Sequence, residues 1–230
     1  MNPIDPTHDT RTRLLLAAVQ VFAAKNFEGS SIREIARQAG ANSALIQYYF
    51  GGKEGLYLEA VKFVFAMGCD MLRDLPPLPA AGDAGARVQA VECLKAYIRN
   101  LVKVTYLAPR RMQDLYGPEV EQAAFSLWTR EMQSLHPTVV DFIQEAIAPF
   151  MEYLRSCLLV LLPDLTEESL FRLSLSIQGQ LTHLHSHMGL VKLRRSSVYT
   201  EPELDSLSEH FIQFSLRGLG IPEAFPLQGA

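Results

Sequence analysis

Apolar residues recur at intervals of three and four along nearly the whole chain, and no long stretch alternates between apolar and polar residues. This spacing puts apolar side chains on one face of an α-helix, so the sequence predicts an all-helical fold. By residue number, the expected helices are 9–25, 31–38, 42–50, 53–72, 87–107, 109–116, 118–133, 137–162, 167–193 and 202–219. A stretch rich in Pro, Ala and Gly, 75–85, is expected to be a loop.

The three N-terminal helices carry signals for their own ends. Asp9 is placed to cap the first helix and Asn42 the third. The spacing Ser31-x-x-Glu34 predicts a capping box, in which the Ser oxygen accepts from the third amide and the Glu carboxylate accepts from the amide of the Ser. We therefore expect two short helices directly after a longer one.

The spacing of the two short helices is that of a helix-turn-helix. Ala36 is small where the two helices must approach closely, and Gly40 supplies a left-handed turn. Ile46 fills the wedge between them. In such a motif the second helix enters the major groove of DNA, so the pattern predicts a DNA-binding element.

The helical wheel assigns the faces of the helix over 42–50. With Ile46, Tyr49 and Phe50 directed toward the other helices, small and amide side chains face outward. Gln47 can pair with adenine and Arg33 can reach a guanine, whereas hydroxyl and ammonium groups can hold phosphates. The residues expected to contact DNA are Ser31, Arg33, Asn42, Ser43, Ala44, Leu45, Gln47, Tyr48, Tyr49 and Lys53.

These residues resemble the TetR family of bacterial transcription regulators over about residues 9–62. The resemblance rests on Phe22, Gly29, the segment 31–36, Gly40 and the segment 48–57. It implies a homodimer of all-helical subunits, usually a repressor. Each subunit would have an N-terminal three-helix DNA-binding domain, here 1–52, and a larger helical effector-binding and dimerisation domain, here 53–230.

The segment 44–57 looks more like the CecR branch of that family, and so do Arg130-Glu131-Met132 and His136-Pro137-Thr138 in the body. The chain departs from the common family pattern at Leu45 and Gln47, so no operator sequence is carried over. The CecR resemblance implies a small-molecule effector of the xenobiotic kind without naming it. Implied partners are a double-stranded DNA operator, this effector and a second copy of the chain.

A ligand pocket in the body would be mainly apolar with a few convergent polar groups. The candidates to line it are Phe125, Trp128, Arg130, Tyr153, Gln178 and His183. For any single one of them, a place in the core or on the solvated surface is the alternative, and the sequence favours it. The dimer interface is expected on the last two long helices, on apolar faces that include Leu173, Ile177, Leu181, Leu184, Phe211, Phe214 and Leu219.

Charge and composition agree with a small docking surface on an acidic body. Residues 1–62 hold seven basic and six acidic residues, a net charge of +1, which leaves −5 for the rest of the chain. No stretch is long and apolar enough for a membrane span, and the N-terminus lacks the features of a secretory or transit peptide. The protein is therefore expected in the cytoplasm, with its three cysteines reduced and no membrane partner.

Catalysis has little support in the sequence. It contains no nucleophile elbow, phosphate-binding loop, dinucleotide fingerprint or Cys-x-x-Cys motif, so an enzyme, a cofactor and a metal are not expected. The spacing His183-x-His185-x-His187 leaves a metal enzyme as a minor alternative. The main alternative is a helical ligand-binding or interaction protein that does not read DNA.

Overall fold

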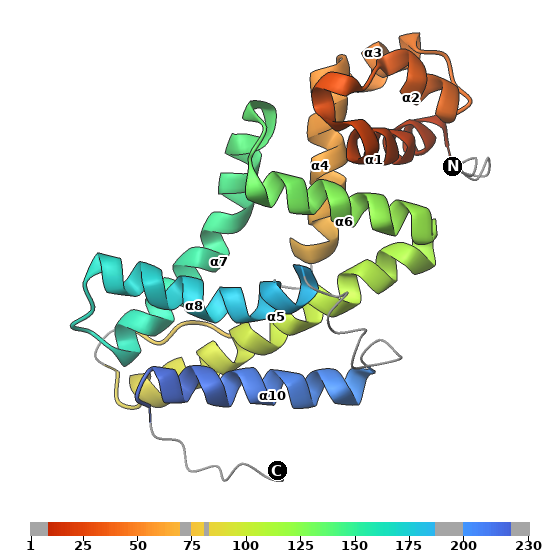
Figure 1. The fold of residues 1–230 in the computed structure, drawn as a ribbon. Coiled ribbons are helices and arrows are strands. Elements are labelled where there is room, and N and C mark those ends of the chain that lie inside the picture. Colours follow the sequence, from red (N-terminus) through yellow and green to blue (C-terminus); the bar gives the residue numbers. More distant parts are fainter. Residues whose placement is uncertain (1–8, 70–74, 81–82, 187–199, 222–230) are drawn as a thin grey trace. The chain divides into compact units, whose positions relative to one another are not determined.

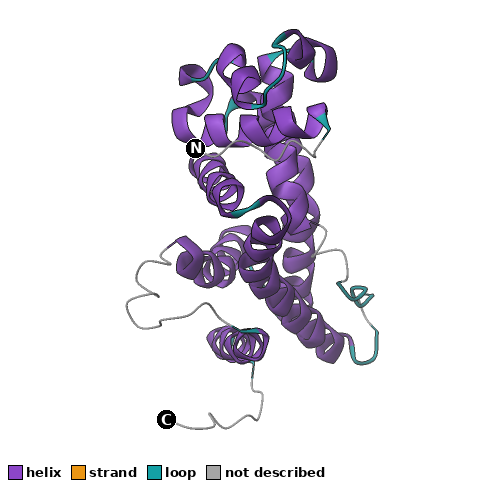
Figure 2. Ribbon diagram, turned by 90° about the vertical axis from the view of Figure 1, so that its right-hand side faces the viewer, coloured by secondary structure: helices purple, strands orange, loops and turns teal. Residues whose placement is uncertain are grey.

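The described part of the chain is built from helices and the loops between them. The structure, a computed structural model, describes residues 9–69, 75–80, 83–186 and 200–221, and within these ranges there is no strand (Figures 1 and 2). The all-helical prediction is confirmed for this part of the chain. Its helices are α1 (Thr10–Gly29), α2 (Ile32–Gln38), α3 (Ala44–Phe50), α4 (Lys53–Cys69), α5 (Ala86–Tyr116), α6 (Pro118–Gln133), the 3-10 helix η2 (Pro137–Val139), α7 (Val140–Leu161), α8 (Glu167–Ser186) and α10 (Glu201–Gly218).

The prediction of separate helices over 87–107 and 109–116 is wrong, because α5 continues through Pro109. A proline inside a helix removes one backbone hydrogen bond and strains the preceding turn. It does not end a helix whose apolar residues lie buried on both sides of it, as Val102 and Met112 do here. The helix expected over 167–193 is observed to Ser186, and its remaining residues lie outside the described ranges.

The chain divides into two compact units, and neither is continuous in sequence. Unit 1 contains Met1–Asp70 and Leu107–Ile147, and unit 2 contains Met71–Tyr106 and Ala148–Ala230. Helices α4 and α6 both pack on α1, so the N-terminal helices share a core with part of the predicted body. Compactness therefore divides the chain differently from the expected functional boundary between 52 and 53, which stays a prediction.

The core of unit 1 forms around α1. Nine consecutive residues of α1, from Leu14 to Phe22, are buried, which requires neighbours on every side of the helix. Helices α2, α4 and α6 all pack on α1, and α3 packs on α4. The ring of Phe22 meets Tyr57 of α4 edge to face, with 4.8 Å between centroids, and Leu127 of α6 lies fully buried in the same cluster.

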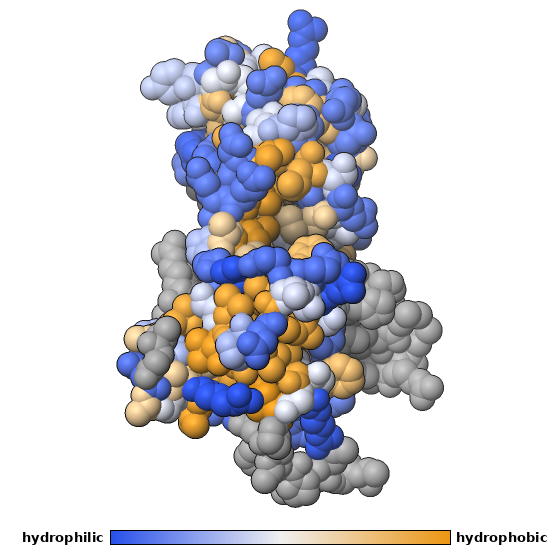
Figure 3. Space-filling model, turned by 90° about the vertical axis from the view of Figure 1, so that its left-hand side faces the viewer, coloured by the Kyte–Doolittle hydropathy of each residue, from blue (hydrophilic) through white to orange (hydrophobic). Residues whose placement is uncertain are grey.

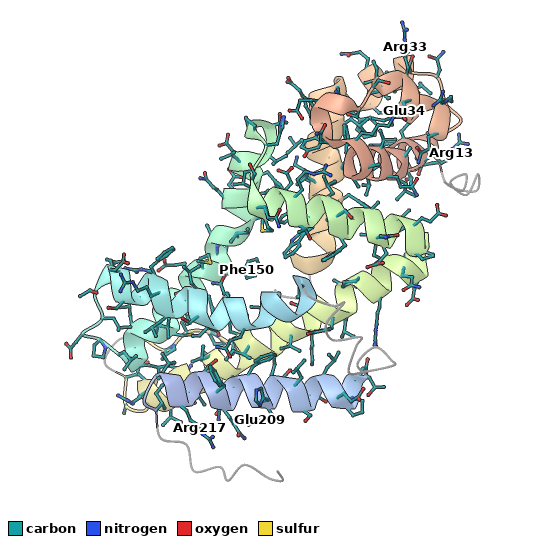
Figure 4. The ribbon with its side chains drawn as sticks, in the orientation of Figure 1. Arg13, Arg33, Glu34, Phe150, Glu209 and Arg217 are labelled. Atoms are coloured by element: carbon teal, nitrogen blue, oxygen red, sulfur yellow. The ribbon has the colours of Figure 1, made fainter. Side chains whose placement is uncertain are left out.

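Unit 2 is formed by the first part of α5, the last part of α7, α8 and α10. Its buried residues include Leu94, Leu158 and Ile212, one each from α5, α7 and α10. At the surface, Arg99 of α5 and Glu209 of α10 form an ion pair at 3.6 Å. Glu209 and Arg217 of α10 are labelled in Figure 4. No helix within the described ranges is long and apolar enough to cross a membrane.

Candidate nucleic-acid interface

Side chains cap the N-termini of the first two helices largely as the sequence predicts. Asp9 caps α1, because its carboxylate accepts from the amide of Thr12 at 3.0 Å, and this hydrogen bond lowers the pKa of Asp9. Ser31 caps α2 by accepting from the amide of Glu34 at 3.2 Å. The second half of the predicted capping box is not formed, because the Glu34 carboxylate pairs with the ammonium of Lys25 at 2.6 Å instead.

The helix-turn-helix spacing predicts the packing of α2 and α3 correctly. Ala36 and Ile46 are buried in the core cluster between these helices and α1. Gly40 has a φ of 60°, the left-handed conformation that glycine adopts without strain. The turn is closed by a hydrogen bond from the amide of Ala41 to the carbonyl of Ala36 at 2.9 Å. The turn geometry at Gly40 and the buried side chains of Ala36 and Ile46 therefore fix how α3 follows α2.

The junction between α3 and α4 depends on a glycine that the sequence does not single out. Gly51 ends α3 in a left-handed conformation, with φ 73°. At Gly55, in the first turn of α4, an added Cβ atom would lie 1.8 Å from the carbonyl oxygen of Phe50. Only a residue without a side chain fits there, so Gly55 lets α4 start directly against the end of the recognition helix.

Most residues expected to contact DNA are exposed. The exposed ones are Ser31, Arg33, Asn42, Ala44, Gln47, Tyr48 and Tyr49, whereas Ser43, Leu45 and Lys53 are half-buried. Among the large hydrophobic side chains described in unit 1, Tyr48 is the most exposed, at 79%, and its ring meets Tyr49 edge to face. Arg33, labelled in Figure 4, points away from the helices around it. Polar and aromatic groups thus gather on one surface around α3, which a folded core would not require.

Three of the expected DNA contacts also have partners inside the protein. The hydroxyl oxygen of Ser31 caps α2, and the side-chain oxygen of Asn42 accepts from the amide of Ala44 at 2.9 Å. The ammonium of Lys53 lies over the ring of Phe27, 4.5 Å from its centroid. These contacts orient the side chains and leave their remaining hydrogen-bonding capacity for a ligand.

The predicted pocket residues divide between the two units. Phe125, Trp128 and Arg130 lie on α6 in unit 1 and are half-buried there. In unit 2, the hydroxyl of Tyr153 donates to the carbonyl of Pro76 at 2.8 Å, and the amide of Gln178 lies 3.0 Å from the sulfur of Met151. The side chain of His183 lies outside the described residues, as do those of His185 and His187. A pocket formed by these residues stays a prediction.

Unit 1 contains a buried polar cluster that the sequence pattern did not predict. Glu131 on α6 is only 1% exposed and accepts from the hydroxyl of Tyr57 and from the amide of His136, the latter at 2.9 Å. Burial and the hydrogen bond to Glu131 raise the pKa of Tyr57. Glu131 follows the buried Leu127 by four residues, so its place on the core-facing side of the helix was a signal in the sequence.

Two features bear on chemistry other than binding: the Cys157 thiol and any cluster of possible metal ligands. Burial is the main cause that raises the pKa of the Cys157 thiol to about 12, so this group stays protonated and unreactive near neutral pH. The described residues contain no group of three or more His, Cys, Asp or Glu side chains placed to hold a metal ion. The three histidines of the metal hypothesis lie outside that search.

Two family models match successive parts of the chain. The model for the tetR family of bacterial regulatory proteins matches residues 14–60, and that for the C-terminal domain of the dual regulator CecR matches residues 106–219. The first match covers α2 and α3 with most of α1, and the second runs from the last part of α5 through α10. The two matches together support the resemblance seen in the sequence.

Among individual proteins, the chain is 40% identical over 57 residues to the transcriptional repressor NicS of Pseudomonas putida, a match that covers 25% of this chain and 27% of NicS. It is 43% identical over 54 residues to the dual regulator CecR of Shigella flexneri, covering 24% of each chain. The matched part thus spans about a quarter of the length of these relatives.

The fold is similar to that of solved regulators. The crystal structure of PfmR, a TetR family transcriptional regulator from Thermus thermophilus, aligns with a TM-score of 0.57 at 16% identity, over 92% of this chain and 97% of that one. At this identity the likeness concerns the fold, and the family rests on the two sequence matches. With its helix-turn-helix in the first match and its body in the second, the chain belongs to the TetR family of bacterial regulatory proteins and has CecR-like features in its C-terminal half.

Proposed function

We propose that the protein is a sequence-specific DNA-binding transcriptional regulator that acts as a repressor and is released from its operator by a small molecule. The exposed polar surface around α3 is the observation that carries the proposal. Gln47 and Arg33 offer side chains that can distinguish bases, and the tyrosines at 48 and 49 offer hydroxyls for phosphates. A DNA-binding role also places the protein with the chromosome, in the cytoplasm.

A homodimer is part of the proposal, and the structure changes which residues could form it. Phe171 and Leu175, one turn apart on α8, are 54% and 50% exposed, and Phe214 on α10 is 60% exposed. Apolar residues also gather in the lower half of the face shown in Figure 3. Exposed apolar side chains of this size are typical of an interface. We propose that α8 and α10 pair with their copies in a second subunit.

The expected dimer face is wrong for three of its residues. Ile177, Phe211 and Leu219 are buried inside their own subunit, so they cannot contact a partner. Helical spacing identifies an apolar face but does not tell whether a helix of the same chain or a second chain covers it. Phe214 is the member of the predicted set that stays well exposed, and Leu181 and Leu184 have side chains outside the described residues.

The effector is proposed as a small molecule that binds the body and prefers the conformation with low DNA affinity. It can lower operator affinity only by the difference in its own affinity for the two conformations, which is typically about 1 to 3 kcal/mol. NicS is named a transcriptional repressor and CecR a dual regulator, so repression is the simpler assignment and activation at some promoters the second one.

Selection of bound sequences from a random DNA duplex pool tests the proposal. Purified protein at fixed near-physiological salt should enrich a near-palindrome with half-sites about one helical turn apart, because two recognition helices of a symmetric dimer would enter successive major grooves. The control is the same selection after any copurified small molecule has been removed from the protein. If folded, dimeric protein enriches no sequence before or after this removal, the interaction-protein alternative is favoured.

Two substitutions separate base reading from phosphate binding. Gln47→Ala should change the ranking of operator variants and weaken the preferred one by about 1 to 3 kcal/mol. Lys53→Ala should weaken all sequences alike and reduce the slope of affinity against salt by about one. If Gln47→Ala left the ranking unchanged, its proposed base contact would be wrong.

A further inference from the structure

Helix α1 contains a backbone break at Asn26. This residue has φ 59° and ψ −178°, a conformation that residues with a side chain rarely adopt. No other non-glycine residue in the described ranges has a positive φ. Its side-chain oxygen accepts from the amide of Gly29 at 2.9 Å, which stabilises the turn locally. The break changes the direction of the chain four residues before Ser30, which leads into α2.

Two carbonyl groups just before the break accept hydrogen bonds from a side chain of another helix. In an uninterrupted helix, the carbonyls of Phe22 and Ala23 would accept from the amides of residues 26 and 27. Here Arg130 of α6 donates to both carbonyls: its Nη1 lies 2.7 Å from the oxygen of Phe22 and its Nη2 lies 2.6 Å from the oxygen of Ala23. A planar guanidinium with two parallel N–H groups matches two successive carbonyls of a helix end.

The segment after the break is held by the same part of the chain. The ring of Phe27 contacts the rings of His136, at 4.4 Å between centroids, and Tyr57, at 5.1 Å, and these two rings also contact each other. The amide of His136 donates to Glu131, and so does the hydroxyl of Tyr57. The two adjacent residues of α6 therefore act on the two sides of the break, since Arg130 caps the helix before it and Glu131 holds the contacts of the residue after it.

These contacts determine where α2 begins. The hydroxyl of Ser30 donates to the carbonyl of Phe27 at 2.7 Å, and Ser31 then caps α2. If the break at Asn26 closed into continuous helix, Phe27 and Ser30 would rotate with the helix and the start of α2 would move. The broken conformation is thus needed for the observed placement of the helix-turn-helix.

We propose that Arg130 is a positioning residue for operator binding, which caps the broken end of α1 and thereby holds α2 and α3 in the DNA-binding arrangement without touching DNA. This inference rests on the proposed DNA-binding function. It gives Arg130 a role other than that of a ligand contact, since both of its terminal nitrogens are engaged with α1. The geometry also makes Arg130 and Asn26 one coupled pair, because the cap compensates for the conformation that Asn26 must adopt.

The test uses Arg130→Met, which keeps the length of the side chain and removes all five N–H donors. Arg111→Met, at an exposed position of α5 in the same unit, is the matched control. We expect Arg130→Met to weaken operator binding at least tenfold in fluorescence anisotropy, with an unchanged slope of affinity against salt. A slope reduced by about one would mean a direct phosphate contact and would overturn the proposal.

Hydrogen exchange gives a readout that does not need DNA. In Arg130→Met, the amides of residues 26–31 should exchange at least tenfold faster than in the wild type and in Arg111→Met. Unchanged exchange in this segment would contradict the capping role. Failure of the wild type to bind any operator would contradict the proposed function instead, and the exchange experiment would still decide the role of Arg130.

Substitution at the break itself separates positioning from general damage. Asn26→Gly adopts a positive φ without strain, so in the Arg130→Met background it should restore part of the lost operator affinity. Asn26→Ala favours continuous helix and should weaken operator binding in the wild-type background. If Arg130→Met does not fold, Arg130→Lys is measured in its place, since a lysine keeps the charge but not the pair of parallel donors. Wild-type affinity in Arg130→Lys, or no effect of Asn26→Gly, would overturn the proposal.

Discussion

The hydrogen bond between Tyr57 and Glu131 connects α4 to α6 inside the core of unit 1, and Tyr57→Phe removes it with little change in shape. Both residues are 1% exposed, so neither group can be hydrated in the folded protein. The Glu131 carboxylate would keep the amide of His136 as a donor and lose the phenol. The substitution thus leaves one oxygen of a buried acid without its hydrogen bond.

The expected loss in the free energy of unfolding is about 1.5 to 3 kcal/mol, the range for a hydrogen bond to a charged group. The edge-to-face packing of the Tyr57 ring on Phe22 and Phe27 is retained by phenylalanine, so no cavity contributes. The pKa of Tyr57 is raised by burial and by Glu131, so the wild type gains stability from this group below pH 10 and loses it as the pH rises above 10. The difference between wild type and variant should therefore shrink above pH 10.

Urea unfolding at one fixed protein concentration measures this loss, with Tyr48→Phe as the exposed control. The midpoint should fall for Tyr57→Phe, at an unchanged slope m, and stay within error for the control. Glu131→Gln, which removes the charge but keeps an acceptor, should make the further change Tyr57→Phe less costly. A loss below about 0.5 kcal/mol, the size expected of an ordinary surface substitution, would refute the reasoning that the buried carboxylate depends on the phenol.

Two further predictions concern packing and ionisation. Gly55→Ala should lower the free energy of unfolding by about 1 to 3 kcal/mol, because the added Cβ cannot fit against the carbonyl of Phe50. Gly218→Ala is the control, since its Cβ would meet no atom within 4 Å, and urea unfolding compares the two variants. Burial raises the pKa of the Cys157 thiol from 9.0 to about 12, so this thiol should resist iodoacetamide at pH 8 until the protein is unfolded. Its contribution to stability should be present below pH 9 and be lost as the pH rises toward 12. Rapid alkylation at Cys157 in the folded protein, located by peptide mass mapping to separate it from the other two cysteines, would contradict the burial of this thiol.

The helix-turn-helix could be predicted from sequence because its determinants are local. A cap at Ser31, a small residue at Ala36, a turn at Gly40 and an apolar wedge at Ile46 lie within sixteen residues and depend on each other. Each of them is a choice among few residue types that satisfy one geometric requirement. The helical period then predicts most of the exposed surface of α3, but it is wrong for Tyr49, which it directs toward the other helices and which is 39% exposed.

The contacts between α6 and the N-terminal helices could not be predicted in this way. Arg130 is separated from Phe22 by 108 residues, and no periodicity relates the two. An adjacent arginine and glutamate are most often solvated, and an arginine near aromatic residues also fits a ligand pocket. The backbone break that makes Arg130 necessary was not visible either, because Asn26 lies within an otherwise ordinary helical pattern.

The shared core of α1, α4 and α6 links the position of α6 to that of the N-terminal helices. Because α6 shares the core of α1 and α4, a displacement of α6 cannot leave the N-terminal helices unchanged: it would withdraw the donors from the carbonyls of Phe22 and Ala23 and a polar partner from Tyr57. Closely packed cores shift between discrete arrangements and do not deform gradually. An effector would then need only to favour one position of α6 in order to change the start of α2, and the free energy available for this is bounded by its own preference for that position.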